Sequence, residues 1–204
     1  MDPDFTAFLS RIEDDLADGA IGLPQAAHAI GERACASVPV SQASLWVLHG
    51  EGRSRFMLRV GGFDAVAGMP LTERAALADA EFAAYFDALT RQSIYVCADA
   101  LTDVPLSAMR ETYLRPQGVG ALVDAAVGVI GAAWGVLCCE HRGSTRHWSP
   151  SEVRGVKQMA DAIALRRARQ AARQLGAPTL MGTFVDFVAE QREFPRSTPP
   201  LSAR

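Results

Sequence analysis

The sequence has only four cysteines, and none of them stands in a CxxC pair or at the spacing of a zinc site. Cys138 and Cys139 are adjacent, and because neighbours on a strand face opposite ways, they cannot easily form a disulfide with each other. The N-terminus, MDPDFTAF, lacks the basic region of a signal peptide. These absences predict a cytoplasmic protein with reduced thiols.

The chain also lacks an excess of positive charge, because 23 Asp and Glu residues outnumber 20 Lys and Arg residues. A nucleic-acid partner is therefore not expected, and the arginines after Leu165 are more typical of a solvated helix face. The most apolar uncharged run, 125–139, is shorter than the roughly 20 residues of a membrane helix, so no membrane partner is predicted. A hydrophobic content of 49% instead indicates a globular protein with a core.

The stretch 119–141 is the most apolar part of the sequence, and it predicts a buried β-hairpin. Its glycines weaken a helix, whereas the surrounding Val, Ile and Trp residues favour strands. We expect strands at 119–129 and 132–141, joined by a turn near 130–132. Such a hairpin must lie at the centre of a sheet that helices cover on at least one face.

The other elements are predicted from capping signals and from hydrophobic periodicity. Ser149, Pro150 and Glu152 form a capping box that starts a long helix ending near Leu175. Consecutive hairpins make the expected sheet largely antiparallel. Periodicity predicts helices at 4–18, 24–38, 81–92 and 103–114, strands at 43–48, 56–60 and 93–100, a Gly-rich turn at 50–54 and an irregular loop at 61–80.

The chain is expected to form one domain with two extensions. An N-terminal helix occupies 1–19, the domain with its long last helix occupies 20–175, and 176–204 is a weak helix followed by a disordered tail. The first two helices and the last one are expected on one face of the sheet. Residues 61–118 are expected to cover the other face and to enclose a pocket there. The acidic start and the tail beyond Arg196 suggest a complete chain.

Five segments of the sequence match a known family when they are taken together. They are YFDALTRQ at 85–92, ADALTDVPLSAM at 98–109, YLRPQGVGALVDAAV at 113–127, WGVLCCEHRG at 134–143 and RHWSPSE at 146–152. With these segments the chain resembles the GAF domain, a ligand-binding regulatory module, over roughly residues 20–170. The resemblance is strongest to the GAF domains of bacterial sensor histidine kinases and cyclic-dinucleotide enzymes. It implies an α+β fold with a central antiparallel sheet of five or six strands, terminal helices on one face, a small-molecule pocket on the other, and frequent dimerisation.

Departures from specialised GAF branches weigh against particular cofactors. Bilin-binding GAF domains carry Cys-His just before a Tyr-Leu pair, but this sequence has Met109 and Arg110 there, so a covalent bilin is not expected. Cyclic-nucleotide GAF domains carry an Asn-Lys signature, but this sequence has no asparagine and only one lysine, Lys157. In GAF enzymes that reduce methionine sulfoxide the cysteines lie on pocket loops, whereas three of the four cysteines here lie in apolar strands. The identity of the ligand stays open.

Asp124 is the most informative candidate for the pocket, because it is the one charge in a buried strand and a buried carboxylate is costly without a partner. It either bonds backbone amides and Arg115 structurally or holds a polar group of a ligand. The aromatic candidates are either pocket-lining or core residues. Cys139 and His141 are the only same-face pair in Cys-Glu-His, so no metal site is expected. The candidate ligand-binding residues are Trp46, Tyr95, Tyr113, Arg115, Asp124 and His141.

The sequence therefore predicts a non-enzymatic sensory protein that binds a small molecule and has no catalytic residue or output domain of its own. The surplus of apolar surface on helices 5–16 and 153–175 predicts a homodimer held by these segments. A signal would then leave through a separate, unidentified partner protein, as in a two-component system. Two alternatives stay open: an enzyme on a GAF scaffold, with a redox-active thiol or a hydrolytic site, and a ligand-free dimerisation module.

Overall fold

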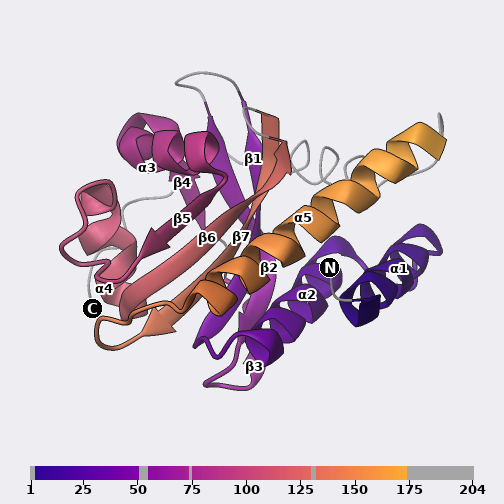
Figure 1. Ribbon diagram of the computed structural model, residues 1–204, viewed down its shortest axis with the longest axis horizontal. Helices are drawn as coiled ribbons and strands as arrows, with labels where there is room; N and C mark the ends of the chain where they lie inside the picture. Colours follow the sequence, from indigo (N-terminus) through magenta and orange to yellow (C-terminus); the bar gives the residue numbers. More distant parts are fainter. Residues whose placement is uncertain (1–2, 51–54, 74, 130–131, 174–204) are drawn as a thin grey trace.

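The computed structural model describes residues 3–50, 55–73, 75–129 and 132–173 (Figure 1). The Gly-rich turn expected at 50–54 and the hairpin turn at 130–132 lie partly outside the described residues, and the C-terminal extension from 176 lies wholly outside them. Within the described ranges, no helix is both long enough and apolar enough to cross a membrane.

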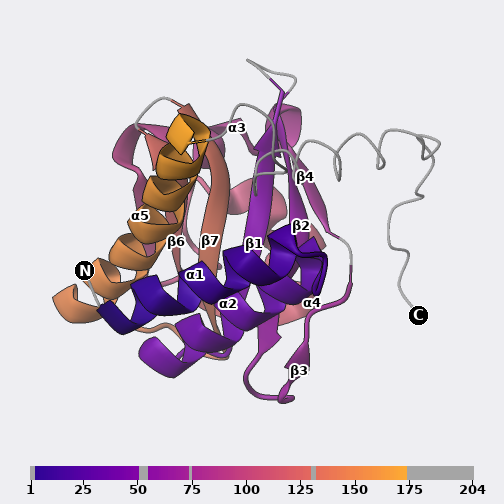
Figure 2. The same cartoon turned by 90° about the vertical axis from the view of Figure 1, so that its right-hand side faces the viewer.

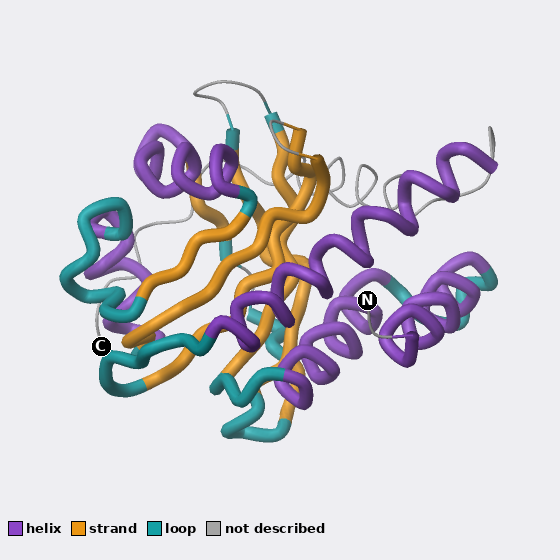
Figure 3. The backbone as a smooth tube through the Cα atoms, in the orientation of Figure 1, coloured by secondary structure: helices purple, strands orange, loops and turns teal. Residues whose placement is uncertain are grey.

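Seven strands form one sheet, in which every pairing between described strands is antiparallel (Figure 3). Their order is β3-β2-β1-β7-β6-β5, and β4 pairs with β2 beside β3. The β6–β7 hairpin is central because each of its strands has a further partner, β5 or β1. The predicted α+β fold is confirmed. The strands are β1 (Gln42–His49), β2 (Phe56–Asp64), β3 (Met69–Pro70), β4 (Ala76–Ala78), β5 (Ile94–Cys97), β6 (Val119–Val129) and β7 (Ala132–Arg142).

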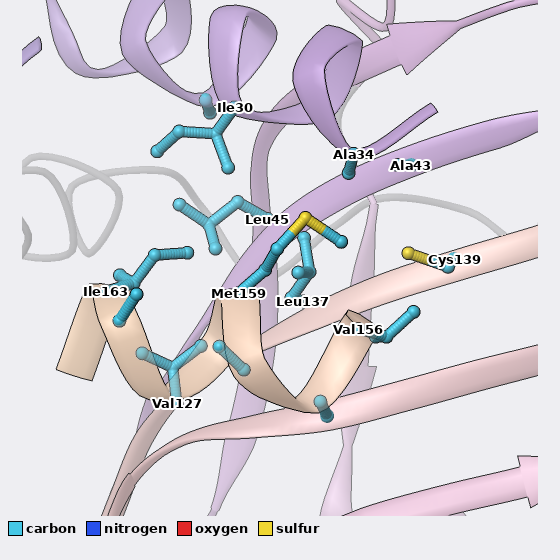
Figure 4. Packing of buried hydrophobic residues seen from close by; sticks show 14 of the residues in the cluster. Ile30, Ala34, Ala43, Leu45, Val127, Leu137, Cys139, Val156, Met159 and Ile163 are labelled. Atoms are coloured by element: carbon cyan, nitrogen blue, oxygen red, sulfur yellow. The ribbon is translucent and has the colours of Figure 1, made fainter. Parts of the chain in front are cut away.

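Three helices lie on one face of the sheet (Figure 2). α2 (Leu23–Ser37) and α5 (Pro150–Arg173) pack against the strands, and α1 (Pro3–Ala17) packs against these two helices. Each strand turns every second side chain toward this face, which gives a continuous apolar layer. The expected placement of the first two helices and the last one is therefore correct. Figure 4 shows the layer at close range, with Ile30, Ala34, Val156, Met159 and Ile163 from the helices and Leu45, Val127, Leu137 and Cys139 from the strands.

α2 packs directly onto the backbone of β1 and β2, because glycines replace side chains at the contact. A Cβ at Gly31 of α2 would lie 2.7 Å from the Ala43 carbonyl oxygen of β1, and one at Gly61 of β2 would lie 3.0 Å from the Pro24 carbonyl oxygen of α2. Gly61 and Gly62 both lie in β2 and pair with β1, and the strand continues to Asp64. The irregular loop predicted at 61–80 is wrong, because this region holds the end of β2 and then β3, β4 and the start of the next helix.

The opposite face is covered by α3 (Asp79–Gln92), a 3₁₀ turn η2 (Ser107–Met109), a π turn η3 (Arg110–Leu114) and α4 (Arg115–Gln117). The single helix predicted at 103–114 is therefore a series of short turns. No helix begins directly after Asp103, because residues 104–106 form a bend and a turn before η2. The Asp103 Oδ1 accepts hydrogen bonds from the Tyr95 hydroxyl and from the Leu106 amide. A second apolar core fills the space between these turns and the sheet.

The capping box predicted at the start of α5 is present. The Ser149 amide donates to Glu152 Oε2 at 2.8 Å, and the Glu152 amide donates to Ser149 Oγ at 3.3 Å. The hydrogen bond from the Ser149 amide is the main cause that lowers the pKa of the Glu152 carboxyl, and Arg146 adds to it. The carboxylate therefore stays charged at the helix start, where the helix dipole favours a negative charge.

The cap gives a first test of the fold. We expect Ser149→Ala to lower the free energy of unfolding by about 1 kcal/mol, because it removes the acceptor of the Glu152 amide. Urea denaturation followed by circular dichroism measures the change. Ser144→Ala, in an exposed part of the preceding loop, serves as control and should change the free energy by less than about 0.5 kcal/mol. Equal stabilities for the two variants would show that the cap contributes nothing.

Candidate functional site

Polar side chains cross the face of the sheet beneath α3 and η3 in two adjacent rows. In the first row Asp64, Gln42 and Glu140 lie opposite one another on β2, β1 and β7. In the second row Tyr95 lies opposite Asp124, on β5 and β6. Residues directly opposite each other on paired strands share a face, so strand register alone brings these groups together. All five side chains are buried.

Glu140 is the centre of a hydrogen-bond network in the first row. Its Oε2 accepts hydrogen bonds from the side-chain amide of Gln42 and from the Tyr113 hydroxyl, the latter at 3.1 Å. Gln42 in turn accepts a hydrogen bond from Arg142, which forms a 2.7 Å ion pair with Asp64. Burial raises the pKa of Glu140, and the Gln42 and Tyr113 donors offset part of that rise. This carboxyl is thus held by side chains from both β1 and the overlying π turn.

Asp124 is buried with an incomplete set of partners. Its Oδ2 accepts a 2.7 Å hydrogen bond from the Tyr85 hydroxyl on α3. Its Oδ1 meets no hydrogen-bond partner among the described residues, although the Cys138 thiol and the Cys139 amide lie near the carboxyl. Burial, and then the charge of Glu140, raise the pKa of Asp124 from 3.8 to about 7. This group therefore changes its charge near neutral pH.

A small cavity lies between the two carboxyls and their cover. Its volume is about 10 Å³, which is close to the smallest space that holds one water molecule. Trp46 and Tyr113 are among the residues that line it, and their rings meet edge to face with centroids 6.2 Å apart. The guanidinium of Arg59 lies 5.7 Å from the centre of the Trp46 ring. Side chains thus fill most of the space in which the pocket is expected.

Three of the six residues predicted from the sequence meet at this cavity, namely Trp46, Tyr113 and Asp124. Tyr95 lies beside them, because its ring packs edge to face against that of Tyr85, with centroids 5.5 Å apart. The tyrosine hydroxyls are not ionised at neutral pH, since burial raises the pKa of Tyr85, Tyr95 and Tyr113. They therefore act as hydrogen-bond donors toward the nearby carboxyls.

Arg115 and His141 lie elsewhere. The Arg115 side chain is 56% exposed on α4 and pairs with Glu111 one turn earlier, so it makes no bond to Asp124. His141 follows Leu137 and Cys139 in the alternation of β7, and these two residues face the α5 side of the sheet. The same alternation puts His141 on the face opposite Asp124.

Sequence reasoning missed Glu140, Gln42 and Tyr85. Cys138 lies opposite Asp124, and side chains alternate along a strand, so Glu140 two residues later faces the same side as Asp124. This alternation in β7 was the sequence signal that could have identified Glu140. No local pattern marks Gln42 or Tyr85, because β1 and α3 reach the carboxyls only through tertiary packing. In the part of the chain that the structure describes, no group of three His, Cys, Asp or Glu side chains could hold a metal ion.

The family model of the GAF domain matches residues 22–166, so the chain belongs to the GAF domain family. A direct comparison with curated proteins finds no match. A phycocyanobilin-bound GAF domain from a cyanobacterial phytochrome aligns with a TM-score of 0.62 at 16% identity, covering 86% of this chain and 100% of that one. A far-red cyanobacteriochrome photoreceptor aligns with a TM-score of 0.61 at 13% identity, covering 80% and 94%.

The GAF domain of Thermosynechococcus elongatus PixJ, in its blue-light absorbing form, also aligns, with a TM-score of 0.56 at 15% identity and coverage of 73% of this chain and 89% of that one. At these identities the likeness shows a shared fold. The predicted antiparallel GAF architecture is therefore confirmed by independent structures as well as by the family match.

The expectation against a bilin is wrong. It rested on Met109 and Arg110, but the chain shares its fold with bilin-binding GAF domains, including one solved with phycocyanobilin bound. A missing thiol removes one point of attachment and leaves the fold unchanged, so a bilin is compatible with this architecture. The cavity of about 10 Å³ is far smaller than a tetrapyrrole, so its lining would have to move apart to hold one. The cofactor therefore stays open.

The raised pKa of Asp124 predicts how stability depends on pH. Between pH 3.8 and about 7 the folded protein keeps a proton on Asp124 that the unfolded chain has released. Stability should therefore fall as pH rises through this window, by about 1.4 kcal/mol for each unit of pKa difference. Asp124→Asn should flatten the fall, because the amide cannot ionise and its oxygen still accepts from Tyr85.

Urea unfolding at a series of pH values from 5 to about 8, above the reach of ordinary carboxyls, measures the slope. Asp161→Asn is the matched control, since the Asp161 side chain is 48% exposed on α5. This control should keep the slope of the wild-type protein. An unchanged slope in Asp124→Asn would show that Asp124 does not titrate in this range.

Proposed function

We propose that the protein is a cytoplasmic, non-enzymatic sensor that binds a small ligand between the sheet and α3 and signals through its terminal helices to a partner protein. The observation that carries the proposal is Asp124 Oδ1, a buried acceptor at the wall of the cavity with no partner in the described ranges. Leaving a buried polar atom unpaired costs free energy, which a hydrogen-bond donor on a ligand would recover.

Irregular backbone in α3 and η3, which cover the cavity, supports the proposal that a ligand larger than water can enter. The turn η3 carries Tyr113 in a π conformation, which is rare and frequently found at functional sites. α3 is interrupted at Phe82, whose φ of −123° and ψ of 27° are not helical. Both irregularities belong to the cover, whereas β6 and β7 beneath are long paired strands. The cover is therefore the part that would move.

The central hairpin provides a path from the carboxyls to α5. Val123 and Ala125 flank Asp124 along β6 and pack into the core on the opposite face. Cys139, beside Glu140, belongs to the same apolar cluster as Val156 of α5 (Figure 4). A displacement of either strand at the carboxyls would therefore reach α5 through a neighbouring residue.

The raised pKa values of the four cysteines support a function in which no thiol acts as a nucleophile. Burial raises the pKa of Cys97 to about 12 and of Cys35 to about 11, and it raises the pKa of Cys138 and Cys139 well above 9. The thiolate is the reactive form, so these groups are protonated and unreactive at neutral pH. All four thiols are free, which fits a reducing compartment such as the cytoplasm.

Substitutions at Asp124 test the ligand site. Native mass spectrometry and absorbance spectroscopy of protein expressed with and without a bilin-synthesis pathway would identify a retained small molecule. We expect Asp124→Ala to weaken its retention about tenfold or more, because the ligand loses a buried acceptor. Asp124→Asn keeps one acceptor oxygen and should lose less. The exposed Asp161→Asn should behave as the wild-type protein.

A loss of stability without any loss of ligand would contradict the role of Asp124 in the ligand site. If Asp124→Ala lowers stability by about 1–3 kcal/mol and leaves the bound molecule unaffected, Asp124 serves the fold alone. A wild-type protein that retains no molecule under either expression condition would contradict the proposed site directly.

We further propose that α5 forms the interface of a homodimer. Phe5, Leu9 and Ile12 of α1 are buried within their own chain, so little of the apolar surplus expected at 5–16 is left for a partner. α5, in contrast, extends past the strands in Figure 1, and Leu165 on it is 40% exposed. Of the two segments expected in the interface, 5–16 and 153–175, we therefore propose only the second, and within it the C-terminal half of α5.

Light scattering tests this assembly. The full chain at tens of micromolar should have twice the 21.8 kDa mass of one chain. Leu165→Glu should shift it toward the monomer, because it places a charge in an apolar interface. Val66→Glu is the matched control, since Val66 is 73% exposed in a turn far along the chain from α5. A monomeric wild-type protein would exclude the dimer.

A further inference from the structure

A second and larger hollow lies at the outer edge of the sheet, between α2 and the segment that follows β3. Its volume is about 370 Å³, which is within the range of small-molecule sites. Pro24, Gln25 and His28 of α2 form one wall, and residues 70–73 form the other. Arg59 and Val60 of β2 form the floor. We call this hollow the edge cleft.

The pairing of β2 explains why the sheet is open here. β3 pairs with the last two residues of β2, whereas β4 pairs with the first three. Between these pairings, the outer segment is held by the Leu71 amide, which donates to the Gly62 oxygen, and by the Arg59 amide, which donates to the Ala75 oxygen, each at 2.9 Å. The edge cleft is therefore bounded by fixed backbone.

Arg59 is buried at the floor of the edge cleft with unused hydrogen-bond donors. Its side chain is 2% exposed, and its Nε and Nη2 donate to the Glu73 carbonyl oxygen at 2.9 and 2.6 Å. Its Nη1 is buried and finds no partner among the residues described. A guanidinium has five N–H donors, and leaving buried donors unpaired is costly. Arg59 therefore lacks acceptors.

The carboxylate that comes nearest to Arg59 is that of Glu73, whose Oε2 lies 3.9 Å from Nη2. This distance is too long for a hydrogen bond, and the Glu73 side chain is 66% exposed. The contact is therefore a loose one that another anion can replace. An arginine with free donors in a concave wall is the arrangement that recognises carboxylates with two parallel hydrogen bonds.

We propose that the edge cleft binds a small organic carboxylate, with its carboxylate group on Arg59 in place of the Glu73 side chain. The apolar body of the ligand lies against Pro24, Val60 and Leu71, and Gln25 and His28 supply polar contacts on the α2 wall. The site goes beyond the proposed sensor pocket, since it lies at the sheet edge and shares no lining residue with the cavity at Asp124.

Titration with benzoate, followed by ¹H–¹⁵N correlation spectra of the full chain, tests the edge cleft. Benzoate should shift the amide signals of residues 58–62 and 71–73 in a saturable manner. Benzamide, which has the same shape without the charge, should bind at least about tenfold more weakly. Equal affinities for the two compounds, or benzoate shifts centred elsewhere, would overturn the proposal.

Glu73→Gln provides a variant on an exposed residue whose folding is not in question. It removes the competing carboxylate, so benzoate should bind several-fold more tightly than to the wild-type protein. Arg59→Gln should weaken benzoate binding about tenfold or more, because it removes a charge-assisted hydrogen-bond pair. Arg115→Gln, at an exposed arginine that likewise pairs with a glutamate, is the matched control and should bind as the wild-type protein does.

A blocking variant covers the case in which Arg59→Gln fails to fold. Thr72 is exposed at the rim of the edge cleft, so Thr72→Trp should fill the hollow, abolish benzoate binding and leave the unfolding midpoint unchanged. Normal benzoate binding by Thr72→Trp would overturn the proposal, and so would unchanged or weaker binding by Glu73→Gln.

Discussion

Two carboxyl groups buried at the middle of the sheet set requirements that the surrounding elements meet. Asp124 and Glu140 share one face of the β6–β7 hairpin, and a buried carboxyl is stable only with polar partners. The hydroxyls of Tyr85 and Tyr113 supply these partners from α3 and η3. The cover is thus tied to the sheet at two points by hydrogen bonds, in addition to its apolar packing. Because each bond has a direction, it fixes where α3 and η3 lie more sharply than apolar contact does.

The two faces of the hairpin consequently respond differently to change. On the α5 face, Leu137 and Cys139 pack in a dense apolar layer that gains nothing from a change of pH or from a polar ligand. On the other face, the charge of Asp124 depends on pH and on what reaches its unpaired Oδ1. A donor at Oδ1 favours the charged form, and the charged form repels Glu140. Any binding event at Asp124 therefore alters the electrostatics of both central strands.

The parts that could be predicted from the sequence are those determined by local signals. The strand at 119–129 and the start of α5 at Pro150 are correct, because an uncharged β-rich run and a capping box each specify one structure. The loop predicted at 61–80 failed because Gly61 and Gly62 resemble a strand end, whereas Gly61 is required by the close approach of α2 and Gly62 by that of the β1 backbone. Asp124 was recognisable as a charge within an apolar strand. Its partner Tyr85 was not, because no local pattern relates a helix residue to a strand formed 39 positions later.

Arg59 connects the two hollows of the molecule electrostatically. Its guanidinium lies over Trp46, which lines the cavity at Asp124, and it also donates to the carbonyl oxygen of Glu73, which lines the edge cleft. Its positive charge lowers the pKa of Glu140 and of Tyr113. An anion bound at Arg59 would offset that charge and make it harder for Glu140 to ionise. By thermodynamic linkage, a change in the charge of Glu140 would alter the affinity of Arg59 for an anion by the same factor. An anion on Arg59 would in this way couple the edge of the sheet to its centre through the charge of a single side chain.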